Sequence, residues 1–186
     1  MKRILSIVLL TVICFGTSLQ AADQLMEVQA LRRPVAIEHV SDFNQLVVLN
    51  QRSASLSFLD LTTQQVVNEV AIGGKPTDME LVDGTNILAI TNEETHLISL
   101  YQVLNNGLSA LADIKVCTYP RHVQYEPEQG LLFVSGMWSQ QLAVVKLDRQ
   151  DPSGSSLVQT VDMAFTPHNI VFLPDHKHMV VGDCHG

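Results

Sequence analysis

The sequence has few cysteines and few basic residues. Three cysteines in 186 residues are too few to build a small fold held together by disulfides. Lysine and arginine number 11 against 19 aspartates and glutamates, which gives a formal net charge of −8. A chain this acidic lacks the positive surface that binds phosphate backbones, so we expect no nucleic-acid partner. The 46% apolar and 16% charged content excludes wholesale disorder, and the length suits one domain of ordinary size.

The short motifs that mark common active sites are also missing. No Cys-x-x-Cys and no His-x-x-x-His occurs, so the sequence carries no standard zinc pattern. It also lacks the Gly-x-Ser-x-Gly of a nucleophilic serine and a glycine-rich phosphate loop. Covalent haem needs Cys-x-x-Cys-His, but Val181 stands where the first cysteine would precede Cys184 and His185. We therefore expect no cofactor and no catalytic residue that a motif identifies.

Residues 1–21 have the order of a secretory signal peptide. Lys2 and Arg3 precede an almost wholly apolar stretch, residues 4–16, and small residues lead up to Ala21. That apolar stretch would span roughly 20 Å as a helix, less than the ~30 Å hydrocarbon core of a bilayer. An N-terminal membrane anchor is the alternative, and no later segment is long enough to cross. Cleavage after Ala21 leaves 9 basic against 19 acidic residues, a net charge of −10, and predicts a periplasmic or secreted protein.

Four copies of one pattern organise the rest of the chain. Each copy begins at a repeat proline, and the copies align without a gap for seventeen columns. These prolines are Pro34, Pro76, Pro120 and Pro167, spaced 42, 44 and 47 residues apart. Three positions on stand Ile37, Met79, Val123 and Ile170, and sixteen positions on stand Asn50, Asn92, Gly136 and Asp183. Turn residues fill positions seven and eight. Chance does not align four copies in this way.

Within each copy, apolar residues alternate over short runs that turn residues separate, which is typical of strands. Each copy therefore predicts a four-stranded antiparallel meander, the blade of a β-propeller. We expect an all-β fold with about 3.5 blades, an incomplete ring. The predicted parts are a signal peptide (1–21), a lead-in or closing outer strand (22–32) and a partial propeller (33–186). The blades are expected at about 33–74, 75–118 and 119–165, with a half blade at 166–186.

The strand motifs resemble a known family. In residues 34–61, a proline and an apolar residue three positions on lead to Leu46-Val47-Val48, then Asn50, then Leu-Ser-x-Leu-Asp-Leu. This pattern resembles the YVTN-type β-propeller repeat, and residues 98–101 with 106–108 are similar to lactonase-like seven-bladed propellers. The resemblance covers about residues 30–186, although residues 41–44 replace the usual Pro-Asp-Gly turn. It implies a fold more than a function, because propellers host many chemistries.

Three and a half blades do not close a ring, because propellers typically have four to eight. A blade face of four strands ~4.8 Å apart and ~17 Å long covers about 330 Å². Its burial is worth on the order of 8 kcal/mol, which is comparable with the ~5–15 kcal/mol stability of a whole domain. We therefore expect this chain to be the N-terminal part of a longer polypeptide that supplies the remaining blades. A self-associating arc is the alternative.

One end of the blades gathers the candidate functional side chains. The first strand starts and the second ends at the same end of each blade, and the first strands line the channel. The ligand-binding candidates on this face are Asp78, Arg121, His122, His168 and Trp138. His168, Cys184 and His185 have side chains that bind metals, although their spacing is no motif. The alternative is that these side chains bond backbone groups between blades and that Trp138 packs on a neighbouring blade.

Three classes of function remain open. The first is an exported propeller that binds or scaffolds an unknown small molecule or protein without catalysis. The second, which the resemblance implies, is a lactonase-like hydrolase with His122 or His168 as general base beside Asp78 or Arg121. The third is the propeller part of a periplasmic redox protein joined to a haem domain. Turnover of a lactone that is lost on His122→Ala would favour the second, and a Cys-x-x-Cys-His elsewhere in a longer chain would favour the third.

Overall fold

The computed structural model describes residues 31–184. The predicted signal peptide, residues 22–30 of the predicted lead-in and the metal candidate His185 lie outside the described residues. The described part is almost entirely strand, with two single-turn 3-10 helices at Ser41–Phe43 and Pro152–Gly154. None of its helices is long and apolar enough to cross a membrane.

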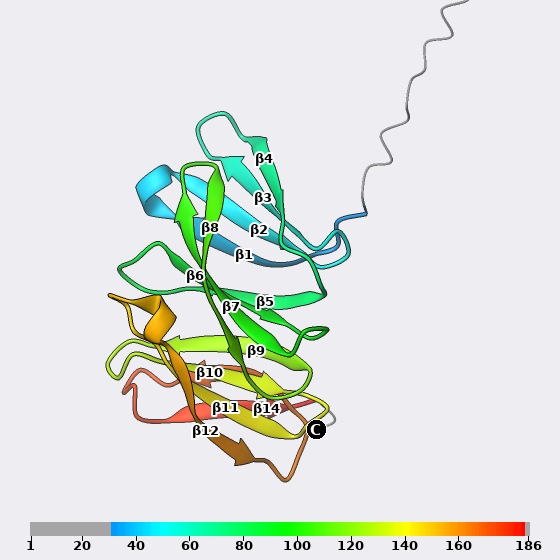
Figure 1. The fold of residues 1–186 in the computed structure, drawn as a ribbon, viewed down its shortest axis with the longest axis vertical. Helices are drawn as coiled ribbons and strands as arrows, with labels where there is room; N and C mark the ends of the chain where they lie inside the picture. Colours follow the sequence, from blue (N-terminus) through cyan, green and yellow to red (C-terminus); the bar gives the residue numbers. More distant parts are fainter. Residues whose placement is uncertain (1–30, 185–186) are drawn as a thin grey trace, which may run out of the picture.

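The strands form three antiparallel four-stranded sheets and one two-stranded hairpin, each a simple meander (Figure 1). The first sheet holds β1 (Pro34–Val40), β2 (Gln45–Asn50), β3 (Ser55–Asp60) and β4 (Gln65–Ala71). The second holds β5 (Pro76–Leu81), β6 (Ile87–Asn92), β7 (Leu97–Leu104) and β8 (Gly107–Lys115). The third holds β9 (Pro120–Glu126), β10 (Leu131–Gly136), β11 (Gln141–Lys146) and β12 (Ser156–Asp162). The hairpin is β13 (Pro167–Phe172) and β14 (Met179–Asp183).

The repeat prolines have one structural role. Each is the first residue of the first strand of its sheet, and each is paired with the residue sixteen positions on, at the end of the second strand. The pairs are Pro34 with Asn50, Pro76 with Asn92, Pro120 with Gly136, and Pro167 with Asp183. Proline suits the start of an edge strand because it has no N–H to donate to a ladder. The sequence columns therefore correspond to equivalent places in the fold.

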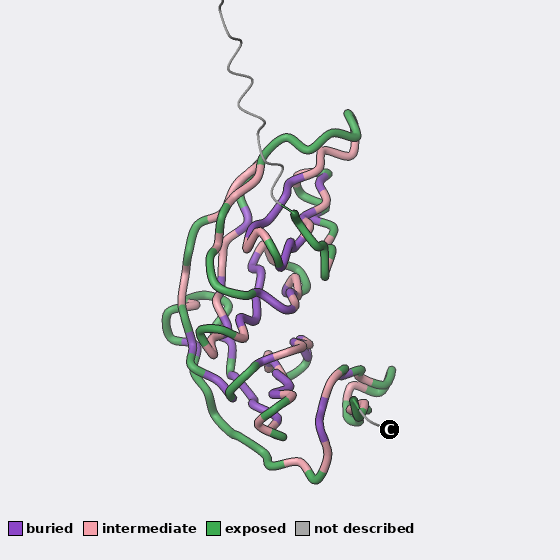
Figure 2. The backbone as a smooth tube through the Cα atoms, turned by 90° about the vertical axis from the view of Figure 1, so that its right-hand side faces the viewer, coloured by how far each residue is buried: buried purple, intermediate pink, exposed green. Residues whose placement is uncertain are grey.

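The sheets lie one after another in an arc, as Figure 2 shows. The first strands β1, β5, β9 and β13 are neighbours in that order along one side of the arc, and β4, β8 and β12 form the opposite edge of their sheets. The chain folds as part of a β-propeller. This confirms the predicted fold class, an incomplete ring of four-stranded blades, while the unit boundaries proposed from the sequence stay predictions.

The core lies between neighbouring blades. The second blade presents Leu88 and Ile90 to the first blade, where they pack with Leu49 and Phe58. Its alternate residues, among them Ala89, pack on the third blade. Side chains of a strand point alternately to the two faces of a sheet, so a blade with a neighbour on both faces buries every residue of its β6. This explains why residues 87–90 of β6 are all apolar, whereas the outer strand β12 is exposed along its length.

The two ends of the arc leave apolar side chains uncovered. On β1, Ile37 is 59% exposed, and on the hairpin Val171 and Val180 are 57% and 56% exposed. The columns that hold Ile37 and Val180 are interior positions where a neighbouring blade is present, because Met79 in the column of Ile37 is 3% exposed and Ala89 in the column of Val180 is 0% exposed. Their exposure therefore follows from position at the end of the row, not from a polar sequence.

Candidate functional site

Four of the five predicted ligand-binding residues come together at one end of the first strands. Asp78, Arg121, His122 and His168 line a small cavity of about 190 Å³. The remaining lining residues are Val35, Thr77 and Asn169. Every one of these seven residues lies one or two positions after a repeat proline. We call this set the channel-mouth cluster.

Irregular strand pairing explains why two successive residues face the same cavity. In all four copies the register between the first and second strands shifts just after the proline, for example between Pro76 and Asp78. A bulge of this kind re-aims a side chain that regular alternation would send to the other face. The positions one and two after the proline are therefore both available at the mouth. The sequence repeat marks the columns, but it does not reveal the bulge.

Asp78 and His122 form the centre of the cluster. Asp78 Oδ2 bonds to His122 Nδ1 and accepts a hydrogen bond from the backbone N–H of Val123 at 3.0 Å. On its other side, His122 Nε2 donates to the carbonyl oxygen of Ile170 at 3.2 Å. Burial lowers the pKa of His122, but the hydrogen bond and charge of Asp78 outweigh it, so the pKa is raised overall. This chain of contacts joins the second blade to the third and the third blade to the hairpin.

Arg121 and His168 lie beside this chain. Arg121 Nε donates to His168 Nε2 at 3.5 Å, and His168 Nδ1 bonds to the side-chain oxygen of Asn169. Arg121 Nη1 lies 4.0 Å from Glu93 Oε2, and Glu93 also pairs with Lys75. The hairpin is held by Ser135 Oγ, which donates to the His168 carbonyl oxygen at 2.6 Å. Arg121 is thus a cation at the mouth. Within residues 31–184, the only acid that its terminal nitrogens approach is Glu93, at 4.0 Å.

Two carboxylates deeper along the first strands were not among the predicted site residues. Glu80 Oε1 accepts from Gln124 Nε2 at 2.8 Å and from the N–H of Tyr125 at 3.3 Å. Burial raises the pKa of Glu80 to about 7, with the charges of Glu38 and Asp78 adding to the effect. Burial likewise raises the pKa of Glu38. The signal in the sequence is an acidic residue four positions after the proline, two residues beyond the column of Asp78.

The other predicted residues do not join the cluster. Trp138 is 65% exposed and does not line the cavity. Cys184 lines a different opening of about 280 Å³ with His168, Asn169, Gly182 and Asp183. Within residues 31–184 no three histidine, cysteine, aspartate or glutamate side chains are grouped so that they could hold a metal ion. The third metal candidate, His185, is outside this range, so the metal site stays a prediction from the sequence.

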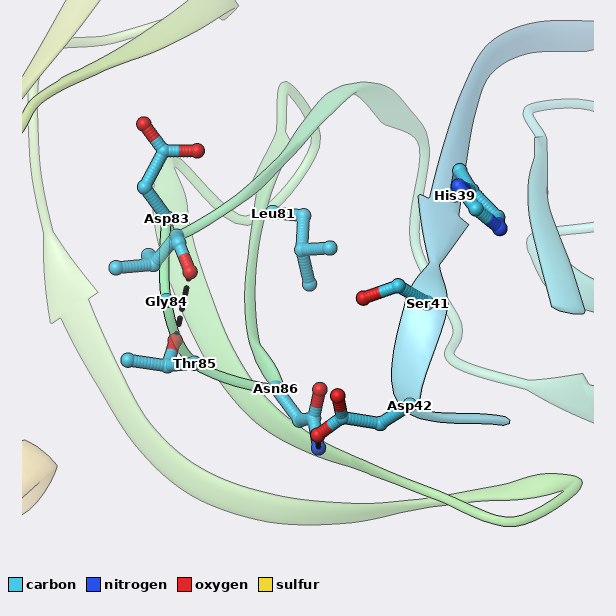
Figure 3. A pocket seen from close by; sticks show the side chains of 9 residues that line it. His39, Ser41, Asp42, Leu81, Asp83, Gly84, Thr85 and Asn86 are labelled. Atoms are coloured by element: carbon cyan, nitrogen blue, oxygen red, sulfur yellow. Dashed lines mark hydrogen bonds between the residues drawn. The ribbon is translucent and has the colours of Figure 1, made fainter. Parts of the chain in front are cut away.

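A polar pocket lies at the opposite end of the first two blades (Figure 3). It has a volume of about 380 Å³. Its walls are the turn after β1, with Ser41 and Asp42, and the turn between β5 and β6, where Thr85 Oγ1 donates to the Val82 carbonyl oxygen at 2.8 Å. Asn86 Nδ2 donates to Asp42 Oδ2 at 2.9 Å and so connects the two walls. The pocket is a polar contact region between two blades. The carboxylate of Asp42 already accepts a hydrogen bond from the amide of Asn86.

Comparisons with known proteins relate the chain to others through its fold. No protein-family model matches the sequence, and no curated protein matches it. Among solved structures, hydrazine synthase of Kuenenia stuttgartiensis is 24% identical with a TM-score of 0.68, over 81% of this chain and 42% of that one. The periplasmic gluconolactonase of Pseudomonas aeruginosa is 16% identical with a TM-score of 0.64, over 73% and 41%. The Cps50 (Swd1) β-propeller domain of Myceliophteria thermophila is 14% identical with a TM-score of 0.63, over 81% and 50%.

At these identities the likeness establishes the fold and nothing finer. It supports the lactonase-like propeller fold that the sequence motifs resemble, while the YVTN-type repeat itself stays a prediction. The chain spans half or less of the length of these three proteins. Their activities therefore bear on this chain only as proposals.

Proposed function

We propose that this protein is a non-catalytic, exported propeller module that binds a small anionic ligand at the channel mouth. The observation that carries the proposal is that both histidines of the mouth have both ring nitrogens bonded to protein groups. His122 is bonded to Asp78 and to the Ile170 carbonyl oxygen. His168 is bonded to Arg121 and to Asn169. A general base needs a free ring nitrogen within reach of the proton that it removes, so these bonds favour binding over catalysis.

Arg121 supplies the attraction for the ligand. Its guanidinium presents five N–H donors in a planar fork that matches a carboxylate. One of these donors points to His168, and the nearest acid, on Glu93, is at 4.0 Å. Within residues 31–184 the remaining donors have no partner, so they can bind an anion in the cavity beside Thr77 and Asn169. Asp78 does not compete for Arg121 because it is bonded to His122 and to the Val123 N–H.

Export is part of the same proposal. The charged, apolar and small-residue order of residues 1–21 is typical of a secretory signal. One of the similar solved structures is a periplasmic protein by name. Detection of the mature protein beginning near residue 22 in a periplasmic or culture fraction tests this point.

The mouth-binding proposal predicts a large loss on Arg121→Gln. D-gluconate is a suitable probe because it is a small carboxylate. We expect calorimetric titration to show a gluconate site that Arg121→Gln weakens about tenfold or more, through the loss of a charge-assisted hydrogen bond. Arg149→Gln is the matched control, because Arg149 Nη2 donates to the Asp83 carbonyl oxygen near the opposite end. Equal weakening by both substitutions would contradict the assignment.

Lactone hydrolysis is the second candidate function. It is favoured by the hydrogen-bonded Asp78–His122 pair, which resembles a base with its orienting acid, and by the fold likeness to the gluconolactonase. Wild-type protein with glucono-δ-lactone tests it: hydrolysis above the uncatalysed rate that disappears in His122→Ala would establish catalysis and refute the non-catalytic proposal. We expect no acceleration over the buffer rate. The redox alternative is tested by the sequence of any longer form of the chain, in which a Cys-x-x-Cys-His motif would favour it.

We further propose that additional blades cover the exposed ends of the arc. Ile37 at one end and Val171 and Val180 at the other are more than half exposed, and soluble monomers avoid large apolar patches. A longer form of the chain is the source of blades that we favour, and a second copy is the alternative. Native mass measurement of the 186-residue chain should show assemblies or aggregation. A stable, soluble monomer would overturn this proposal.

A further inference from the structure

A cleft lies between the first and second blades, at the same end of the blades as the channel mouth. Its volume is about 470 Å³, in the usual range for small-molecule sites. It is lined by Arg33, Gln51, Arg52, Gly74, Lys75 and Glu94. None of these residues belongs to the channel-mouth cluster. Three cations face one carboxylate in the lining, in a protein that is strongly acidic overall.

Backbone contacts fix the position of the two arginines. The N–H of Gln51 donates to the Arg33 carbonyl oxygen at 3.0 Å, and the N–H of Arg52 donates to the Arg32 carbonyl oxygen at 2.9 Å. The segment just before β1 is thereby tied to the turn between β2 and β3. Arg33 has a positive φ of 53°, which a residue with a side chain adopts only at a cost. The cleft therefore has a defined wall of backbone from which the cations project.

Three side chains of this wall, Arg33, Gln51 and Arg52, have donors without a partner among the described residues, unlike Arg32 beside them. The guanidinium of Arg32 is bonded twice to Glu69, at 3.0 and 2.6 Å. No such acid is paired with the guanidinium of Arg33 or Arg52 within residues 31–184. Gln51 is only 5% exposed, and its side-chain Nε2 makes no hydrogen bond. A buried N–H donor without an acceptor is rare and costly in native proteins, so an acceptor at this place would relieve a real deficit.

The two carboxylates near the cleft do not cancel this attraction. Glu93 pairs with Lys75 and approaches Arg121 at 4.0 Å, so its charge is shared between the cleft and the mouth. Glu94 lines the cleft, and its backbone N–H donates to Asn92 Oδ1 at 3.2 Å. With Lys75 neutralised by Glu93, the two free arginines still exceed the single charge of Glu94. The balance of the lining is positive.

We propose that this cleft binds a small molecule that carries a phosphate or carboxylate group. Guanidinium forks bind both groups in the same two-point manner, and the orphan amide N–H of Gln51 supplies a neutral donor to the same oxyanion. The proposal is independent of the channel mouth, because it rests on other residues and on an unsatisfied donor that the mouth lacks. It also differs from general attraction by a basic surface. Such attraction depends on charge alone and would not involve the buried, uncharged side chain of Gln51.

The test is titration calorimetry of the full mature chain with two probes, inorganic phosphate and citrate, at constant ionic strength. We expect at least one of them to occupy a site in this cleft, and the tighter probe tells a phosphate ligand from a carboxylate ligand. Arg52→Gln and Gln51→Leu should each weaken binding about tenfold, as expected for lost hydrogen bonds to an anion. Arg32→Gln is the matched control, because that neighbouring arginine is occupied by Glu69, and it should leave binding within about twofold.

The outcomes separate the alternatives. Absence of binding of both probes at millimolar concentration would overturn the proposal, and so would equal losses in Arg32→Gln and Arg52→Gln, the result of a diffuse charge effect. Circular dichroism shows whether Gln51→Leu reduces folding. If it does, Arg52→Gln still tests the proposal, because it changes an exposed side chain. Arg121→Gln should leave intact the site that Arg52→Gln weakens, so a second anion site that Arg121→Gln removes belongs to the mouth. Failure of gluconate at the mouth would refute the proposed function without affecting this result.

Discussion

Replacement of Gly74 by alanine is expected to destabilise the protein by about 2–4 kcal/mol. Gly74 has a positive φ of 65°, and an added Cβ would lie 2.2 Å from Nδ2 and 2.6 Å from Oδ1 of Asn92. The backbone strain contributes about 1–2 kcal/mol and overpacking about 1–3 kcal/mol. Asn92 cannot move aside, because its Oδ1 accepts from the N–H groups of Lys75 and Thr95 at 3.0 and 3.3 Å. Its Nδ2 donates to the Gly73 carbonyl oxygen at 3.2 Å.

The preceding residue provides the matched control. Gly73 also has a positive φ, of 77°, but an added Cβ there would meet nothing within 4 Å. Gly73→Ala should therefore cost only the strain of a left-handed residue, about 1–2 kcal/mol. Urea denaturation of both variants measures the two free energies of unfolding. If the two losses were the same, Asn92 would not fix the turn that leads into the second blade.

Replacement of Glu80 by glutamine is expected to stabilise the protein above neutral pH. The folded protein raises the pKa of Glu80 to about 7, first through burial and then through Glu38 and Asp78. In the unfolded chain this carboxyl ionises near pH ~4.3. The folded state therefore binds more protons between those two values, and stability falls as the pH rises from about 4.5 through about 7. Glutamine cannot ionise, and its side-chain oxygen still accepts from the N–H of Tyr125.

The expected gain at pH 8 is about 2 kcal/mol, which allows for the partial exposure of the group. Thermal unfolding between pH 4.5 and 8 should show a decline in wild type that is much reduced in Glu80→Gln. Glu128→Gln makes the same chemical change at an exposed position and should leave the profile unchanged. His122, whose pKa is raised by Asp78 once burial is overcome, contributes a decline in the same direction that remains in the variant. A profile in Glu80→Gln as steep as in wild type would show that Glu80 ionises freely in the folded protein.

The blade organisation could be predicted from the sequence because it is written in equivalent columns. A proline must stand where no N–H is needed, and each of the four prolines begins a first strand. Apolar residues must face neighbouring blades, so residues 87–90 of β6 in the second blade are apolar on both faces. Both the proline and the apolar residues are required by local structure, and they recur in each copy of the repeat. The face on which Asp78, Arg121, His122 and His168 gather followed from the same columns.

The contacts within that face could not be predicted in this way. The bulge after each proline sets which side chains reach the cavity, and no single residue type encodes it. Trp138 occupies the expected face yet stays exposed and apart from the cluster. Glu80 became a perturbed acid only because Tyr125 and Gln124 of the next blade lie against it.

The repeat in the amino-acid sequence is enough to predict an all-β propeller arc and the residues that begin and end its inner hairpins. Contacts between blades, in contrast, leave both mouth histidines fully bonded, and within residues 31–184 they leave Arg121 with unpaired donors and Gln51 buried without an acceptor. The difference lies in the distance along the chain between the residues involved. Strand patterns depend on neighbours a few residues away, whereas the hydrogen bonds and pKa values at the mouth depend on side chains about forty residues away on another blade.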